Sequence, residues 1–300
     1  MPSPFAKKFR SLLPGQQSEL TIINADGTGR DVIFAVDDAI IEAPNWHPSG
    51  DYLVFNAGGE IWRINVDGSG LKKIETGTIR DLNNDHVLSP DGKTIYLSNQ
   101  SDGSLYAVGI EGGTPRKVSN THTTPHHYYL HGVSPDDKTL SYVAVEGPEG
   151  KKRVNMFTIP TSGGPDTRLS DVSYPNDGPE YSPDGKWIYF NSERDATQPG
   201  HAQCYRMRPD GSGIEQLTHG ESVNWFPHAS PDGTQYVYIS YPKGTLGHPE
   251  NKNVRLMLMP PDGSSHKEII AFFGGQGTIN VNSWAPDSKR FAYVAYPVLN

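Results

Sequence analysis

The stretch SPDGKTIYLSNQSDGSLYAVGIEGGTPRKVS, from Ser89 to Ser119, decides the fold. Its opening Ser-Pro-Asp-Gly is a turn sequence, because proline presets one backbone angle, aspartate accepts bonds from nearby amides and glycine adopts the left-handed conformation. The segment 93–99 then alternates apolar residues with smaller or polar ones, as a strand with one buried face requires. A loop, a second strand over 104–110 and a Gly-Gly turn complete the pattern. With the residues before Ser89, the stretch predicts four antiparallel strands.

The same pattern returns along nearly the whole chain. Six copies of the first turn recur every 42 to 55 residues, with prolines at Pro48, Pro90, Pro135, Pro183, Pro231 and Pro286. Six copies of the second turn alternate with them, beginning at or near Asp26, Asp67, Glu111, Ser162, Asp210 and Asp262. A four-stranded unit repeated every ~40 to 50 residues is the signature of a β-propeller. We therefore expect an all-β fold, a six-bladed β-propeller of four-stranded antiparallel blades.

The phase of the repeats predicts how the ring closes. The chain opens with a second-half unit over 19–34 and ends with a first-half unit over 283–296. Two half-blades at the termini make one blade, which removes the sheet edges that an open ring would expose. We expect residues 1–18 to form an N-terminal tail, with Lys7, Lys8 and Arg10 solvated, and residues 19–300 to form a single propeller.

The turn motifs, with Trp46 and Trp284 just before two of the first turns, resemble the TolB-like propeller repeat over about nine-tenths of the chain. Similar repeats occur in TolB, in the gating domains of prolyl oligopeptidases, in tricorn-type proteases and in oligogalacturonate lyases, so the resemblance implies a fold and leaves the activity open. The chain has no G-x-S-x-G motif, and the repeats fill it, which argues against a serine peptidase.

Charge and hydropathy argue against three further classes of protein, namely nucleic-acid-binding, membrane-spanning and exported proteins. The net charge of −8 argues against a nucleic-acid surface, which needs clustered lysine and arginine. No apolar run is long enough to span a membrane. The N-terminal residues contain no apolar core of a signal peptide, so we expect a cytoplasmic protein.

Histidine is the sharpest functional signal. The connectors between blades and the loops between middle strands should emerge on one face of the disc, here called the connector face. The repeated turns should emerge on the opposite face, here called the turn face. Nine of the eleven histidines fall on connector-face segments or at the start of an inner strand. Function usually lies on such irregular loops.

The centre of the site is predicted by counting back two or three residues from the serine of each first turn. We expect the residues at these positions to meet at the channel mouth: Asn45, His86, His131, Glu180, His228 and Asn282. Three imidazoles, a carboxylate and two amides suit a divalent metal ion or an anionic ligand. His86, His131 and His228 are candidate ligands of one such metal ion, Mn, Zn or Ca, and imidazole suits Zn and Mn in particular. The competing interpretation is that these polar side chains bind channel water and cap strands.

Further candidates surround this centre. Aromatic rings beside carboxylates and amides suit a small polar ligand such as a sugar. The ligand-binding candidates are Asn45, Tyr128, Tyr129, Asp177, Glu180, Trp225 and Asn282. Some of the rings could instead pack between blades. Candidate acid or base groups are Asp85, Asp177, Glu180 and Glu221.

Two functions remain open. The first is a binding module that holds a small polar ligand or a protein partner on its histidine-rich channel face, as resemblance to TolB implies. The second is a metal-dependent carbohydrate-active enzyme. Resemblance to the oligogalacturonate lyases implies a histidine-bound manganese, which would stabilise an enolate formed at the channel mouth. No catalytic residue follows from the sequence, and neither does the presence of an activity.

Overall fold

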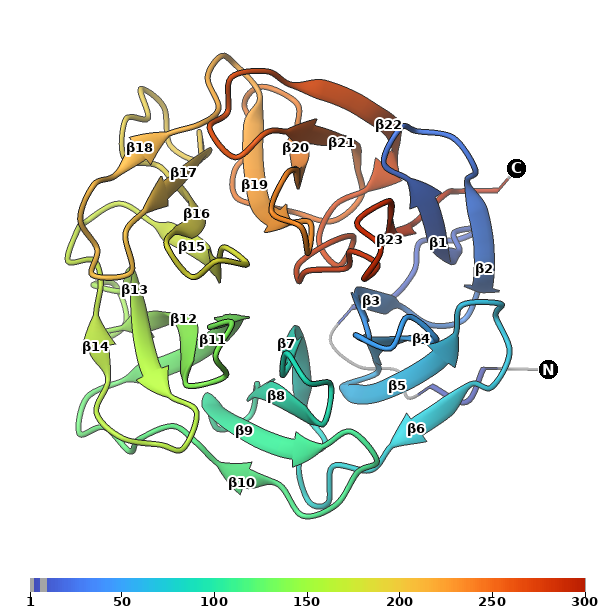
Figure 1. Ribbon diagram of the computed structural model, residues 1–300, viewed down its shortest axis with the longest axis horizontal. Helices are drawn as coiled ribbons and strands as arrows, with labels where there is room; N and C mark the ends of the chain where they lie inside the picture. The colour runs from blue at the N-terminus through green and yellow to red at the C-terminus, as the bar shows by residue number, and fades with distance from the viewer. Residues whose placement is uncertain (1–2, 6–9, 300) are drawn as a thin grey trace.

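The repeated turns fold as their residue types require, in a computed structural model that describes residues 3–5 and 10–299 (Figure 1). Ser89 Oγ donates to Asp91 Oδ1 at 2.8 Å, and the amide of Lys93 donates to the same oxygen at 3.0 Å. Gly92 has a φ of 72°, in the left-handed region that glycine adopts without strain. The equivalent serine hydroxyls bond the turn aspartates at 2.6 to 2.7 Å in three further turns, at Ser134, Ser182 and Ser230. The predicted turn chemistry is confirmed.

Five blades are four-stranded antiparallel sheets, arranged around a central channel (Figure 1). From the channel outward, blade 1 contains β3 (Ile41–Trp46), β4 (Tyr52–Ala57), β5 (Glu60–Asn65) and β6 (Lys72–Ile74). Blade 2 contains β7 (Leu82–Leu88), β8 (Thr94–Asn99), β9 (Ser104–Gly109) and β10 (Arg116–Lys117). Blade 3 contains β11 (His126–Val133), β12 (Thr139–Glu146), β13 (Arg153–Pro160) and β14 (Thr167–Arg168). Blade 4 contains β15 (Asn176–Tyr181), β16 (Ile188–Ser192), β17 (Gln203–Met207) and β18 (Glu215–Gln216). Blade 5 contains β19 (Val223–Ala229), β20 (Tyr236–Tyr241), β21 (Lys252–Met259) and β22 (Lys267–Gly274).

The sixth blade joins the two ends of the chain, as predicted. β1 (Ser18–Asn24) lies between β2 (Asp31–Val36) and β23 (Arg290–Ala295), antiparallel to both. The innermost strand of this blade is reduced to one bridge, between Trp284 and Phe291. The segment before that bridge turns back on itself through a hydrogen bond from the Thr278 amide to the Gly275 carbonyl, instead of extending as a strand.

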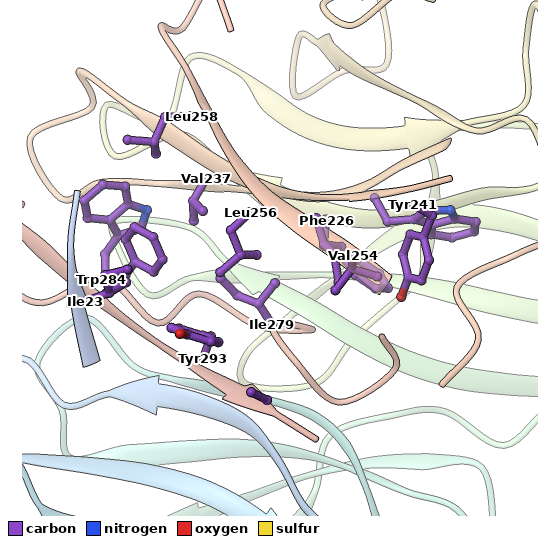
Figure 2. Close-up of a cluster of buried hydrophobic side chains, with 14 of the residues drawn as sticks. Ile23, Phe226, Val237, Tyr241, Val254, Leu256, Leu258, Ile279, Trp284 and Tyr293 are labelled. Carbon is purple, nitrogen blue, oxygen red and sulfur yellow. The ribbon is translucent and has the colours of Figure 1, made fainter. Parts of the chain in front are cut away.

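The core lies between neighbouring blades. Figure 2 shows the cluster between blade 5 and the closing blade, where Ile23 and Tyr293 pack near Leu256 and Ile279. Similar clusters of buried side chains fill the other junctions. Each blade is therefore covered on both faces only because its neighbours are present, as in other repeat architectures. No helix in the described ranges is long and apolar enough to cross a membrane.

The segment before β1 packs on the propeller. The ring of Phe5 is buried and meets Trp62 edge-on, with centroids 4.9 Å apart. Arg10 is mostly buried, and its guanidinium lies 2.9 Å from a carboxylate oxygen of Glu42. The prediction of a solvated Arg10 is therefore wrong, because a buried carboxylate compensates its charge. The other basic residues of that tail, Lys7 and Lys8, lie outside the described residues.

Closure of the ring can be tested in β1. Leu20 is fully buried, whereas Val32 in the adjacent β2 is 37% exposed. We expect Leu20→Ala to lower the free energy of unfolding by about 2–5 kcal/mol, through lost burial and the cavity left behind. The matched Val32→Ala should change it by less than about 1 kcal/mol. Urea unfolding followed by circular dichroism measures both. Equal losses in the two variants would contradict the view that β1 is a core strand of the closed ring.

Candidate functional site

The channel contains two cavities, and His131 is the one described residue that lines both. The cavity on the turn face has a volume of about 380 Å³ and is lined by the prolines of all six first turns. The cavity on the connector face has a volume of about 300 Å³. Its walls come from the starts of inner strands, from intra-blade loops and from the segment that leads into the closing blade. The two cavities meet at His131.

A hydrogen-bonded network centred on Glu180 lies beside the turn-face cavity. Its carboxylate lies 2.6 Å from His228 Nδ1 and accepts bonds from Asn282 Nδ2 at 2.7 Å and from the Ala229 amide at 3.1 Å. His228 Nε2 lies 2.9 Å from the Ile279 carbonyl oxygen. Both ring nitrogens of His228 thus face acceptors, so both bonds form together only when each nitrogen carries a proton. No lone pair of this ring is then free for a metal ion.

The side chain of Asn45 forms further hydrogen bonds between the inner strands of neighbouring blades. Its side-chain Nδ2 donates to the Asn282 carbonyl, and its Oδ1 accepts from the Leu88 amide at 3.1 Å. One amide therefore joins blade 1 to the closing blade and to blade 2. Asn45, Glu180 and Asn282 all line the turn-face cavity.

The expected convergence of six side chains at one mouth needs correction. The chosen positions lie near the end of each inner strand, and this end approaches the turn face. Three of them therefore line the turn-face cavity, His131 lines both cavities, and His86 and His228 line neither. His86 is fully buried, and its ring nitrogens make no hydrogen bond of normal geometry within the described residues. Burial lowers the pKa of His86 to about 4, which keeps the ring neutral.

Of the remaining residues predicted to bind a ligand, some line the connector-face cavity and others lie outside both cavities. Tyr129 and Asp177 line the connector-face cavity. Tyr128 lies in the core of blade 3, where its hydroxyl donates to Asp166 Oδ2 at 3.0 Å, away from the channel. Trp225 is buried in the cluster between blade 5 and the closing blade. Its ring does not line the cavity but meets the ring of His248, which does, edge-on, with centroids 4.5 Å apart. Their ligand-binding roles stay predictions.

The connector-face cavity holds an ion pair that joins two blades. His131 Nε2 of β11 lies 2.9 Å from Asp177 Oδ1 of β15. Burial alone would lower the pKa of His131, but the carboxylates of Asp177 and Asp85 raise it overall. Burial alone would raise the pKa of Asp177, but the charge and hydrogen bond of His131 hold it below its usual range. The pairing therefore favours the charged form of both groups.

Two further ionisable groups face the same cavity. His248 Nε2 lies 3.8 Å from Asp177 Oδ2, and burial lowers the pKa of His248, so this ring is neutral. Asp85 is 6% exposed. Burial raises the pKa of Asp85 to about 7, and the negative charges of Asp177 and Glu42 add to the rise against the opposing charge of His131. One carboxyl of this cavity thus titrates near neutrality.

Bulges in the inner strands shape the cavity wall. The pairing of β19 with β20 shifts register between Trp225 and His228, and Phe226 within this bulge has a φ of 53°. This conformation is uncommon for a bulky residue and directs its ring into the cavity. The ring stacks near His131 with centroids 5.7 Å apart. The matching bulge in β15 contains Gly178, where an added Cβ would lie 2.9 Å from the Phe226 ring.

Sequence reasoning missed several residues of this wall. They are Asn83, Asn84, Gln100, Gln276 and Asn280. Phe226 also lines this wall, and the sequence marks it, because Ala43, Gly178 and Phe226 each precede a proline at the same place in an inner strand, and all three have positive φ. No such repeat marks the missed residues.

The Glu180 network predicts a stability difference. Glu180→Ala would leave the Ala229 amide, Asn282 and His228 without their shared acceptor, so we expect a loss of about 3 kcal/mol in the free energy of unfolding. The matched Glu215→Ala removes a carboxylate that is 48% exposed and paired with Arg206, and should cost about 1 kcal/mol or less. Denaturant titrations of both variants make the comparison. Losses of the same size would show that the network does not stabilise the inner strands.

Comparison with known proteins identifies relatives of the whole fold. The model of the TolB beta propeller domain matches residues 132–248. An uncharacterized protein of Agrobacterium fabrum is 38% identical over 284 residues, which are 93% of this chain and 92% of that protein. The solved structure of a TolB candidate from Agrobacterium tumefaciens has a TM-score of 0.85 at 36% identity, covering 95% of this chain and 99% of the other.

More distant relatives share the architecture. The Tol-Pal system protein TolB of Francisella tularensis is 25% identical over 91% of this chain, and the chain spans 60% of the length of that TolB. An oligogalacturonate lyase solved in complex with manganese has a TM-score of 0.56 at 15% identity, covering 86% of this chain and 74% of the lyase. At that identity the likeness shows the fold alone.

Proposed function

Because the chain belongs to the TolB-like family of six-bladed β-propellers, we propose that it is a binding module whose connector-face cavity holds a polar group of a small ligand or of a protein partner. A protein partner is suggested by the TolB relatives, whose name places them in the Tol-Pal system. Polar groups from five blades meet in this cavity.

One observation carries the proposal: Glu180 and Asp85, two buried carboxylates in the two cavities, differ in their hydrogen-bond partners, since the Asp85 carboxylate accepts one bond, from Asn83, within the described residues. On the turn-face side, Glu180 has three hydrogen-bond partners from the protein. On the connector-face side, carboxylates, imidazoles and amides line a space of about 300 Å³, at the lower end of the usual size of ligand sites. The walls stand on inner strands held by neighbouring blades, so the site is preformed. Preformed polar cavities bind without a large ordering penalty.

The alternative, a metal-dependent carbohydrate-active enzyme, is not favoured by the donor set. His86 lies outside both cavities, His228 faces Glu180 and a carbonyl, and His131 is paired with Asp177. Within residues 3–5 and 10–299, no group of three or more histidine, cysteine, aspartate or glutamate side chains is arranged to hold a metal ion. The residues present do not fit the manganese centre that the lyase resemblance implied, and no metal-assisted step follows from them.

A thermal-shift panel tests the proposal. The probes are galactose, galacturonate and pentylamine, which represent neutral, anionic and cationic ligand groups. We expect at least one class to raise the melting temperature by about 5 °C at saturation, because ligand bound only to the folded state stabilises it. Gln100→Trp, which fills the cavity from a half-buried loop position, should abolish the shift, whereas Gln216→Trp, half-buried in β18 and outside the cavity, should preserve it.

Two results would contradict the proposal. One is the absence of a shift with every probe class. The other is a shift that persists unchanged in Gln100→Trp, since the ligand would then bind elsewhere.

A further inference from the structure

We propose that the group held in the connector-face cavity is a compact organic cation, an alkylammonium carried either by a small amine or by a lysine side chain of a partner protein. This inference rests on the proposed binding function and names the chemistry of its ligand. It is drawn from the charge balance of the cavity and from the side chains that surround Asp85.

Asp85 is a buried carboxylate that forms no ion pair within the described residues. It lines the cavity from the middle of β7 and is 6% exposed. Among the described residues, its carboxylate accepts one hydrogen bond, from Asn83 Nδ2 at 3.0 Å, and no lysine, arginine or histidine forms an ion pair with it. Burial of an unpaired carboxylate is unfavourable, so a site of this kind favours a ligand that brings positive charge.

The other charges near Asp85 are already balanced. Asp177 pairs with His131 at 2.9 Å, and Glu42, which faces Asp85 from β3, pairs with Arg10 at 2.9 Å. His248 contributes no charge near neutral pH. When Asp85 is ionised, the charge left over around the cavity is therefore that of its carboxylate. The carboxylate of Asp85 would repel an anionic ligand, and a neutral sugar would leave its charge uncompensated. A cationic ligand would neutralise it.

The remaining walls suit the rest of an alkylammonium ion. The aromatic rings of Tyr129 and Phe226 line the same cavity, and aromatic faces attract ammonium groups. Valine side chains on β12 and β13 form an apolar wall that an alkyl stem can cover: Val143, Val145 and Val154. The amides of Gln100 and Asn84 offer oxygen acceptors to further N–H groups. Carboxylate, ring and apolar wall together match a charged head on a short hydrocarbon chain.

Isothermal titration calorimetry at fixed ionic strength tests the inference with isosteric probes. The probes are pentylamine, pentanol and pentanoate, which differ mainly in the charge of the head group. We expect pentylamine to bind and the other two to bind at least about tenfold more weakly, because only the amine compensates Asp85. Asp85→Asn keeps the shape and removes the charge, and should weaken pentylamine binding by about tenfold or more. The matched control Asp171→Asn removes a connector-face carboxylate that is 65% exposed and should change binding less than about twofold.

A blocked peptide, acetyl-Gly-Lys-Gly-amide, separates the two sources of the cation. Tighter binding of the peptide than of pentylamine supports a lysine of a partner protein, and binding of pentylamine alone supports a small amine. Circular dichroism melting of Asp85→Asn confirms that the variant is folded. Pentanol or pentanoate binding as tightly as pentylamine, or unchanged pentylamine affinity in folded Asp85→Asn, would overturn the inference. A thermal shift with galactose or galacturonate that Gln100→Trp abolishes would then leave the binding function standing and remove only the preference for a cation.

Discussion

The pairing of β1 with β23 is the constraint on which the rest of the structure depends. Six residue pairs, from Glu19 opposite Ala295 to Asn24 opposite Arg290, join the two ends of the chain in one sheet. The apolar faces of each blade are covered only by its neighbours, so an unclosed ring would expose two of them. Closure also fixes the inner strands relative to one another. Side chains from different blades can then meet in the channel with defined geometry, as Asn45 does with Leu88 and Asn282.

Polar groups are used differently at the two ends of that channel. Around Glu180 the protein supplies every partner, and the resulting bonds tie blade 4 to blade 5 and to the closing blade. Around Asp85 the described part of the chain supplies one amide donor and no ion pair. Both carboxylates are buried and line a cavity, yet Glu180 has three protein hydrogen-bond partners and Asp85 has one. This difference, more than the number of histidines, indicates where a ligand is bound.

The sequence was sufficient to predict the architecture, because turn residues such as Pro90, Asp91 and Gly92 impose local geometry that repeats in phase, and the phase shows that the terminal halves share a blade. The site was predicted in part. Tyr129 and Asp177, expected around the centre, do line the connector-face cavity, whereas His86, chosen by counting back from its first turn, is fully buried and lines neither cavity. Counting along a strand cannot reveal the bulges that shift register in each inner strand, and it cannot show which buried polar groups find partners. Arg10 was misplaced for the same reason, since its partner Glu42 belongs to a distant part of the chain.

The central claim is that the fold buries the carboxyl of Asp85 in the connector-face cavity without an ion-pair partner among residues 3–5 and 10–299. Carbon-13 NMR titration of the aspartate side-chain carboxyls tests it most directly, with Asp85→Asn as the assignment control. Because burial favours the neutral form, the folded protein should hold the Asp85 proton far above the pH at which an exposed aspartate loses it. The account predicts one carboxyl resonance that titrates at a pKa of about 7 and is missing from the variant. If every aspartate carboxyl of the wild-type protein titrates below a pKa of about 5, as unperturbed aspartates do, Asp85 is solvated or paired and the claim is contradicted.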